Sequence, residues 1–322
     1  MNKHVIASVI GGILMILGVA LLGGAVLLSG FDIETLGTDE WETTAYNITD
    51  DFGKISVVSD TADVIFLPSD NGKCRVECKE RKNMKYSVAT IDDGTLSIEL
   101  VDSRKWYEHI SFFSFGKETV TVYLPYAEYE SLYVRNDTGD VEIGDAFSFG
   151  KIDIALSTGD VRCFASVKGA LIVKASTGYI TVSDTEVGSM ELRASTGDIK
   201  ASGVACAGNV SVSVSTGRVS LTDVTCAGLH TEGDTGDIRL DGVIASGTIR
   251  AERDTGDIYL DSCDAASLKI KTNTGHVKGT LLTDKIFYVK SDTGNIRVPT
   301  STEGGLCEIE TDTGDVKIEI VK

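Results

Sequence analysis

The dipeptide Thr-Gly recurs ten times between residues 138 and 314, and successive glycines are 19 or 20 residues apart. Ten copies at so even a spacing indicate an internal structural repeat. A repeat of this length cannot bury an apolar face alone, so it must pack against neighbouring copies of itself. The spacing therefore predicts a stack of similar turns over residues 131–322.

Apolar residues alternate with polar ones on both sides of each Thr-Gly pair. Val or Ile stands two positions after every glycine, as at Val161, Ile238 and Val316. A similar alternation precedes the glycine, for example at Leu171 and Val173. A period of two is the pattern of a half-buried strand. Each repeat therefore predicts a strand, a tight turn, a second strand and a return loop.

Stacked copies of this unit predict an all-β fold, a single-stranded parallel β-solenoid (β-helix or β-roll) of about ten turns. Constant spacing favours copies related by translation, whose strands pair in parallel about 4.8 Å apart. An antiparallel stack of hairpins, with Thr-Gly in the hairpin loops, is the alternative.

Glycine suits the tight turn because it adopts a positive φ without the steric cost of a Cβ atom. We therefore expect Gly236→Val to destabilise the stack locally. The predicted turn glycines are Gly139, Gly159, Gly178, Gly197, Gly217, Gly236, Gly256, Gly275, Gly294 and Gly314.

Residues 5–30 contain no charged side chain and are rich in Val, Ile, Leu and Ala. A helix of roughly 20 apolar residues crosses a bilayer, and no clear small-residue cleavage site follows. This favours one N-terminal transmembrane helix over a cleaved signal peptide. Lys3 precedes the segment and acidic residues follow it. The positive-inside rule then predicts a single-pass protein of the cell membrane, with residues 1–4 in the cytoplasm and the C-terminal domain extracytoplasmic.

The residues between the predicted helix and the repeats are less regular. Residues 31–49 are expected to form a linker, and residues 50–130 an irregular N-terminal β region that caps the solenoid. Within that region, residues 55–66 match the repeat pattern with Ala62 in the place of the glycine. Five aromatic residues gather within ten positions, in a loop that either protrudes for an interaction or folds over the end of the core. They are Trp106, Tyr107, Phe112, Phe113 and Phe115.

The formal net charge is −18. So acidic a surface repels phosphates, which argues against a nucleic acid partner. Glycans and proteins stay possible surface partners, besides the membrane reached through the N-terminal helix. The seven cysteines are an odd number, and Cys206 and Cys226 occupy the same slot of adjacent repeats. We expect buried core thiols, with no disulfide framework and no cofactor.

Aspartates recur in register with the turns, and some stand at both ends of the D-T-G-D sequence. Carboxylates stacked about 4.8 Å apart repel one another, and a bound Ca²⁺ would relieve that repulsion. The alternative is that these acids are solvated turn residues. The candidate metal ligands are Asp234, Asp237, Asp254, Asp257, Asp312 and Asp315.

Two segments and the repeat itself resemble a known bacterial family. They are SVVSDTADVIFLPSD at 56–70, VTVYLPYAEYESLYVRNDTGDVEI at 120–143, and the recurring S/D-T-G-D-I/V. Over about residues 50–322 the chain resembles the "putative adhesin" family of β-strand-repeat proteins, a domain of unknown function. The resemblance implies a surface β-solenoid, suggests adhesion or an envelope-stress role, and supplies no catalytic residues.

Together these features predict a non-catalytic, membrane-anchored surface module for adhesion or envelope interaction. An accessory regulator of an envelope-stress pathway is the first alternative. A calcium-binding solenoid and a polysaccharide-acting β-helix enzyme are further alternatives. Catalysis is disfavoured because a carboxylate that recurs in most repeats indicates turn chemistry, whereas glycan cleavage needs a particular pair of carboxylates in a cleft.

Overall fold

The computed structural model describes residues 41–82, 84–102 and 116–321. Over these residues it contains strands and turns, and none of its segments is a helix long and apolar enough to cross a membrane. The predicted transmembrane helix, residues 5–30, lies outside the described residues.

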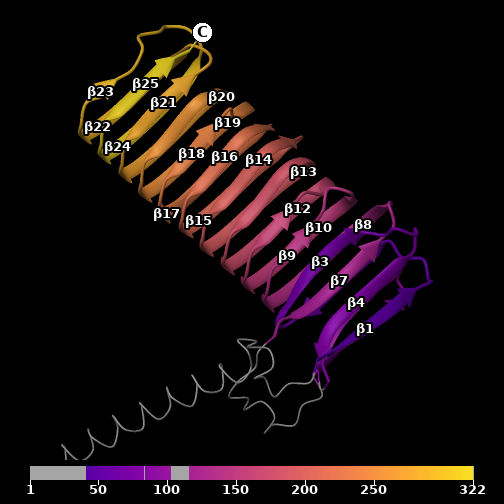
Figure 1. Ribbon diagram of the computed structural model, residues 1–322. Coiled ribbons are helices and arrows are strands. Elements are labelled where there is room, and N and C mark those ends of the chain that lie inside the picture. The colour runs from indigo at the N-terminus through magenta and orange to yellow at the C-terminus, as the bar shows by residue number, and fades with distance from the viewer. Residues whose placement is uncertain (1–40, 83, 103–115, 322) are drawn as a thin grey trace, which may run out of the picture.

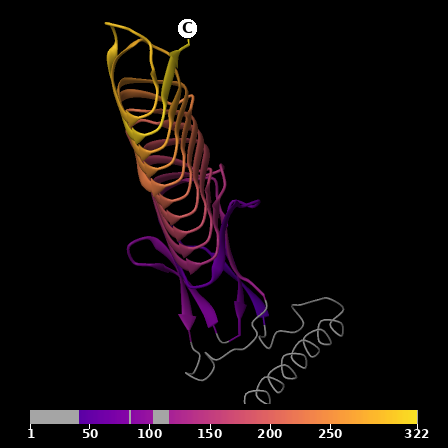
Figure 2. The same cartoon turned by 90° about the vertical axis from the view of Figure 1, so that its left-hand side faces the viewer.

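The strands stack as rungs along one rod (Figure 1). Seen from the side, the repeats form a continuous coil that opens into separate strands at the N-terminal end (Figure 2). The strands are β1 (Trp41–Ile48), β2 (Lys54–Ser59), β3 (Ala62–Pro68), β4 (Cys74–Arg81), β5 (Met84–Ile91), β6 (Thr95–Asp102), β7 (Glu118–Leu124), β8 (Glu128–Thr138), β9 (Val141–Ile143), β10 (Ser148–Thr158), β11 (Val161–Cys163), β12 (Ser166–Thr177), β13 (Ile180–Thr196), β14 (Ile199–Cys206), β15 (Asn209–Thr216), β16 (Val219–Cys226), β17 (Gly228–Thr235), β18 (Ile238–Asp241), β19 (Ile244–Thr255), β20 (Ile258–Thr274), β21 (Val277–Leu281), β22 (Lys285–Thr293), β23 (Ile296–Arg297), β24 (Gly305–Thr313) and β25 (Val316–Ile320).

Neighbouring repeats pair in parallel and in register. Thr158 of β10 lies opposite Thr177 of β12, and Val161 of β11 lies opposite Ile180 of β13. Equivalent positions therefore form columns along the rod, and each column is either buried or solvent-facing. The parallel β-solenoid is confirmed, and the antiparallel stack of hairpins is wrong for the repeats.

The return segment was expected to be a loop, and that expectation is wrong for the central turns. β13 and β20 continue around the turn as strands of 17 residues each. A second corner lies in this segment, where Asp184 has a φ of 52° and Gly203 of the next turn has a φ of 62°. Asp tolerates this left-handed conformation better than most residues. A short polar residue at the corner lets the chain bend without leaving the sheet.

The core is one continuous apolar cluster, mostly of aliphatic side chains, that runs along the rod. Ile154, Leu192 and Ile258, for example, are fully buried. All seven cysteines are buried free thiols, as expected. Burial raises the pKa of the Cys163 thiol to about 12, because the thiolate is disfavoured away from water. These cysteines act as small apolar core residues.

The N-terminal end is closed by antiparallel strands. The layer formed by β2 and β3 lies between the layer of β6 and β7 and that of β8 and β9. Beyond β7, β4 and then β1 continue the sheet antiparallel, and β5 pairs antiparallel with β6. Strands β2 to β7 lie within the region 50–130, for which a cap is predicted, and β1 precedes it. The linker predicted at residues 31–49 is wrong for residues 41–48, because their alternating sequence forms β1.

A buried polar layer lies within this N-terminal cap. The carboxylates of Glu80 and Glu118 are fully buried. Glu80 accepts hydrogen bonds from the Thr44 hydroxyl at 2.6 Å and from the Tyr86 backbone N–H at 2.7 Å. Glu118 pairs with Arg81 at 3.3 Å. Glu80 therefore has hydrogen-bond donors and Glu118 has a cationic partner, so neither carboxylate of this layer is buried without a polar partner.

The last two repeats do not stack in chain order. β24 pairs with β20 on one side and with β22 on the other, and β25 likewise pairs with β21 and β23. The final turn therefore lies inside the rod, and the turn of β22 and β23 forms its end. Ile296, expected in the buried column, is 44% exposed because no further turn covers it.

Candidate binding surfaces of the solenoid

The ten predicted turn glycines lie in one column at the Thr-Gly corner, where successive turns approach closely. A Cβ atom on Gly236, which has a φ of 121°, would lie 2.2 Å from the carbonyl oxygen of Gly217. Gly275 lacks a φ in the region reserved for glycine, yet its Cβ would lie 1.9 Å from the Gly256 oxygen. Glycine is therefore required mainly by the close approach of the turns, and only in part by positive φ.

The aspartate that follows the glycine links one turn to the next. The carboxylate of Asp140 accepts a hydrogen bond from the Asp160 backbone N–H at 2.9 Å, and Asp160 accepts one from Tyr179 at 2.8 Å. Asp237 accepts one from Asp257 at 3.2 Å. Each carboxylate thus satisfies a donor at the corner of the neighbouring turn. We call this series of positions the Asp column.

Three of the six candidate metal ligands belong to the Asp column. The carboxylates of Asp237, Asp257 and Asp315 all accept backbone N–H bonds. Asp257 is partly buried, which alone would raise its pKa, but bonds from the Tyr259 hydroxyl and the His276 N–H lower it overall. The Asn295 N–H likewise lowers the pKa of Asp315. These bonds give the acids a structural role.

The other three candidates, Asp234, Asp254 and Asp312, lie exposed on the opposite side of the corner. Asp254 accepts a hydrogen bond from the Asn273 amide at 3.1 Å. Over the described parts of the chain, no group of three or more His, Cys, Asp or Glu side chains could hold a metal ion. Cation binding remains a prediction of the sequence. The predicted aromatic loop, with Trp106, Tyr107, Phe112, Phe113 and Phe115, lies outside the described residues.

Two departures from the Asp column, separated by one turn, border a hollow on this face. Tyr179 and Arg218 replace aspartate on either side of Asp198, and the Tyr179 side chain is 57% exposed. A hollow of about 460 Å³ lies beside them. Its lining includes Asp160, Arg162, Tyr179, Thr181, Asp198, Lys200, Arg218, Ser220 and Arg239. We call it the Tyr179 hollow.

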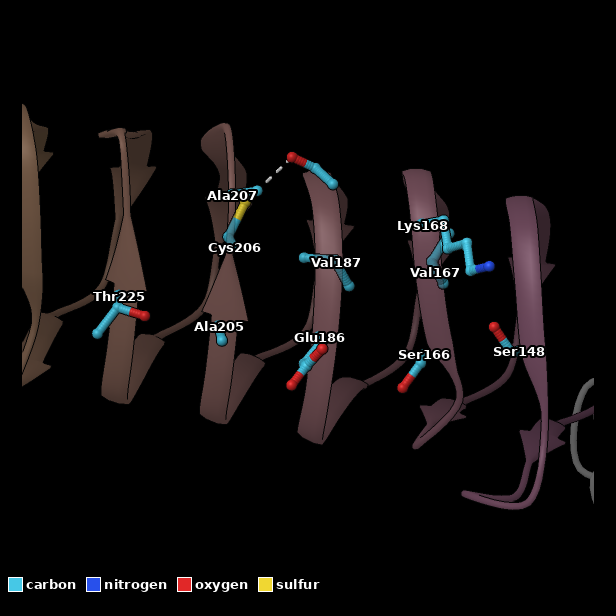
Figure 3. Close-up of a pocket in the computed structure, with 11 residues that line it drawn as sticks. Ser148, Ser166, Val167, Lys168, Glu186, Val187, Ala205, Cys206, Ala207 and Thr225 are labelled. Atoms are coloured by element: carbon cyan, nitrogen blue, oxygen red, sulfur yellow. Dashed lines mark hydrogen bonds between the residues drawn. The ribbon is translucent and has the colours of Figure 1, made fainter.

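A second hollow of about 540 Å³ lies along the return segments (Figure 3). Ser148, Ser166, Glu186, Ala205 and Thr225 line it from successive turns. Cys206 donates a long bond of 3.8 Å to the Gly188 carbonyl. Burial raises the pKa of the Cys206 thiol, so it is a poor nucleophile at neutral pH. Lys168 is paired with Glu128 at 2.6 Å. The lining thus offers small polar groups together with the charged side chains of Lys168 and Glu186.

The described carboxyls whose pKa is shifted share one direction of shift. Where the pKa of a described carboxyl departs from its usual value it is lowered, as for Asp93, Asp264 and Glu319. A catalytic acid needs the opposite shift. His230 pairs with the neighbouring Glu232 at 3.1 Å, and Nδ1 of His276 accepts the Asp315 backbone N–H at 2.8 Å. Both histidines therefore have structural partners.

The sequence interpretation missed the Tyr179 hollow, although a signal for it was present. Six of the ten turns carry aspartate after the glycine, and the exceptions include Tyr179 and Arg218. Alignment on the repeat shows these positions but cannot show that their side chains share one face with Arg162, Lys200 and Arg239. Pairing in register brings them together.

Several solved structures match this chain at low sequence identity. The chain matches solved structures of a "putative adhesin" from Parabacteroides distasonis (14% identity, 88% of this chain and 98% of that chain, TM-score 0.41) and of a "putative lipid binding protein" from the same species (16%, 88% and 98%, TM-score 0.43). It also matches a "putative adhesin" from Bacteroides fragilis (15%, 87% and 97%, TM-score 0.34). No curated protein matches.

The family comparison covers almost all of the described chain. The model of the Toastrack DUF4097 family matches residues 52–211 and again residues 179–322. These ranges begin just before β2 and end with the final turn, so they include both the solenoid and most of its N-terminal cap. The chain belongs to the Toastrack DUF4097 family.

Proposed function

We propose that this chain is a non-catalytic, membrane-anchored surface module, which holds a stiff rod outside the cell for adhesion or envelope interaction. The observation that carries the proposal is the continuous rod. The ten Thr-Gly turns and the two layers β2–β3 and β6–β7 form a single hydrogen-bonded stack. At about 4.8 Å per layer this stack is about 58 Å long.

The polarity of the rod supports surface display. The described chain begins in β1 at one end, and the turn of β22 and β23 forms the opposite end (Figure 1). If residues 5–30 anchor the chain as their composition predicts, β22 and β23 lie farthest from the membrane. Each face of the rod then extends outward from the cell, where a partner can reach it.

The chemistry of the faces supports binding without catalysis. The acids of the Asp column recur at the turns and accept backbone hydrogen bonds, so their pattern is explained by folding. The two hollows described above are lined by residues of the strands and of the short turns between them. Such surfaces suit recognition of an extended partner over several turns.

Surface display can be tested with a single thiol at the far end. Thr302 is exposed in the loop before β24, whereas the native cysteines are all buried. In intact cells that produce full-length Thr302→Cys, a membrane-impermeant maleimide should label the variant rapidly and the parent chain slowly. Labelling of Thr302→Cys only after lysis would contradict the predicted topology.

Adhesion requires a separate comparison. Cells that produce the full chain should attach to at least one coating in a panel of immobilised polysaccharides and matrix proteins. The matched control is a chain that ends after residue 40, which keeps the predicted anchor and lacks the rod. Equal attachment of both cell types across the panel would overturn the adhesive role while leaving surface display intact.

A further inference from the structure

The face of the rod that carries the Asp column also carries a row of cations. Two residues after each position of the Asp column, one residue from each turn forms a second row. In order along the rod this row is Arg162, Thr181, Lys200, Ser220 and Arg239, and each residue pairs in register with the next. Cationic and hydroxyl side chains thus alternate from β11 to β18. Successive cations are two layers apart, which is about 9.6 Å along the rod.

The acids beside this row are largely committed to the backbone. Oδ1 of Asp160 accepts the Tyr179 N–H at 2.8 Å, and Oδ1 of Asp198 accepts the Arg218 N–H at 2.8 Å. The two arginines of the row each face an acid of the Asp column, because Asp160 lies 3.4 Å from Arg162 and Asp237 lies 3.5 Å from Arg239. Between them, Lys200 forms no such ion pair with a described residue, and Tyr179 and Arg218 stand in place of two aspartates.

The side chains that line the Tyr179 hollow have a positive net charge, although the formal net charge of the whole chain is −18. Four cationic side chains line it, Arg162, Lys200, Arg218 and Arg239, against the carboxylates of Asp160 and Asp198 in the lining and that of Asp237, which faces Arg239. Within the described residues, the side chains of Lys200 and Arg218 are exposed and have neither a hydrogen bond nor an ion pair.

Tyr179 adds an exposed aromatic ring to this cationic surface. A phenol ring beside hydroxyls and guanidinium groups offers a flat apolar face for a sugar ring and donors for its substituents. Thr181 and Ser220 supply hydroxyls between the cations. The arrangement therefore combines an aromatic platform with charges at a regular spacing, which inorganic anions alone would not need.

We propose that the Tyr179 hollow binds an acidic polysaccharide that carries a carboxylate on alternate sugar rings. The carboxylates pair with Lys200, Arg218 and the flanking arginines, and one ring packs on Tyr179. A polymer with this moderate charge density suits the site better than a nucleic acid, because the acidic remainder of the surface repels dense phosphate charge. The assignment rests on the proposed surface function and names its ligand class.

The repeat itself supplies variants that should preserve the fold. Tyr179→Asp and Arg218→Asp install the residue that most turns carry at this position, where a carboxylate accepts the next backbone N–H. We expect the double variant to melt at or above the temperature of the parent chain. It removes the aromatic platform and one cation, and it adds two negative charges to the hollow.

Binding is measured with the full-length chain in nanodiscs, by calorimetry with hyaluronan hexasaccharide, which has a carboxylate on every second ring. We expect the double variant to bind it roughly tenfold or more weakly than the parent, as losing a charge-assisted contact implies. Lys269→Ser, on the face formed by β20, is the matched control and should bind as the parent does. Uncharged dextran of equal length should not bind.

Two results would overturn the assignment. One is equal binding by the parent and the double variant, or by neither of them. The other is binding of inorganic polyphosphate that matches hyaluronan and is unaffected by Tyr179→Asp alone, which would indicate charge attraction without a sugar site. If either occurs while cells with the full chain still attach to a coating, the saccharide site fails and the proposed surface function stands.

Discussion

At the residue scale, the Thr-Gly pair is an architectural element. The glycine allows two turns to approach, and the residue that follows it donates and accepts hydrogen bonds along the Asp column. The sequence predicted the glycine position because the spacing is so regular. It did not predict the reason, since the contact between Gly236 and Gly217 joins residues of different turns and depends on how closely these turns stack.

The close approach predicts the effect of a single methyl group. Gly236→Ala places Cβ about 2.2 Å from the Gly217 carbonyl oxygen, so we expect a loss of roughly 3 kcal/mol in the free energy of unfolding. Gly236→Val should lose at least as much. In Gly144→Ala, whose nearest neighbour atom is 3.8 Å from the added Cβ, urea unfolding should give nearly the parent value. Equal stability of both alanine variants would contradict the role of the column.

Acid should weaken the corner bonds of the Asp column. The N–H of Asn295 holds the pKa of Asp315 below its unfolded value of 3.8. A depressed folded pKa adds stability above the unfolded pKa, and this stability is lost as the pH falls through the folded pKa. Urea unfolding of the parent should thus show a steeper loss below about pH 4 than that of Asp315→Asn. Asp312→Asn, an exposed neighbour, should follow the parent curve; identical slopes in all three chains would refute the linkage.

At the element scale, strand type and pairing followed from the alternation of apolar residues, but the order of the last turns did not. Every turn presents nearly the same apolar columns and the same backbone edge, so stacking the β24–β25 turn on β20 or on β22 satisfies the same pattern. Residues 298–304, which lead from β23 to β24, carry no signal of the return. The exposure of Ile296 is the consequence.

This order makes the last two turns mutually dependent. Among the described strands, β22 and β23 pair only with β24 and β25. A chain that ends after Gly304 should therefore lose protection of residues 285–297 from hydrogen exchange, because their only ladder partners are gone. Interior strands such as β15 should keep their protection. Retained protection at residues 285–297 would show that this turn can dock directly on β20 and β21.

At the scale of the whole molecule, the rod combines uniform interior chemistry with a varied surface. The core columns consist mostly of aliphatic residues, so the fold class was evident from the sequence. The Tyr179 hollow depends on side chains from five strands that only the register brings together. Recognition on such a rod is therefore set by which exposed residue each turn contributes, and a large change in binding needs no change in fold.

The Asp column also bears on how such a rod can change its length over evolution. Each carboxylate bonds to the equivalent N–H of the adjacent turn, and the glycines meet like with like. A middle turn can then be duplicated or deleted as one genetic unit, because the new neighbours meet the contacts that the old ones met. The two ends of the rod lack this freedom, because there the layers do not stack in chain order. We expect lineages of this rod to vary in the number of central turns and to conserve both termini.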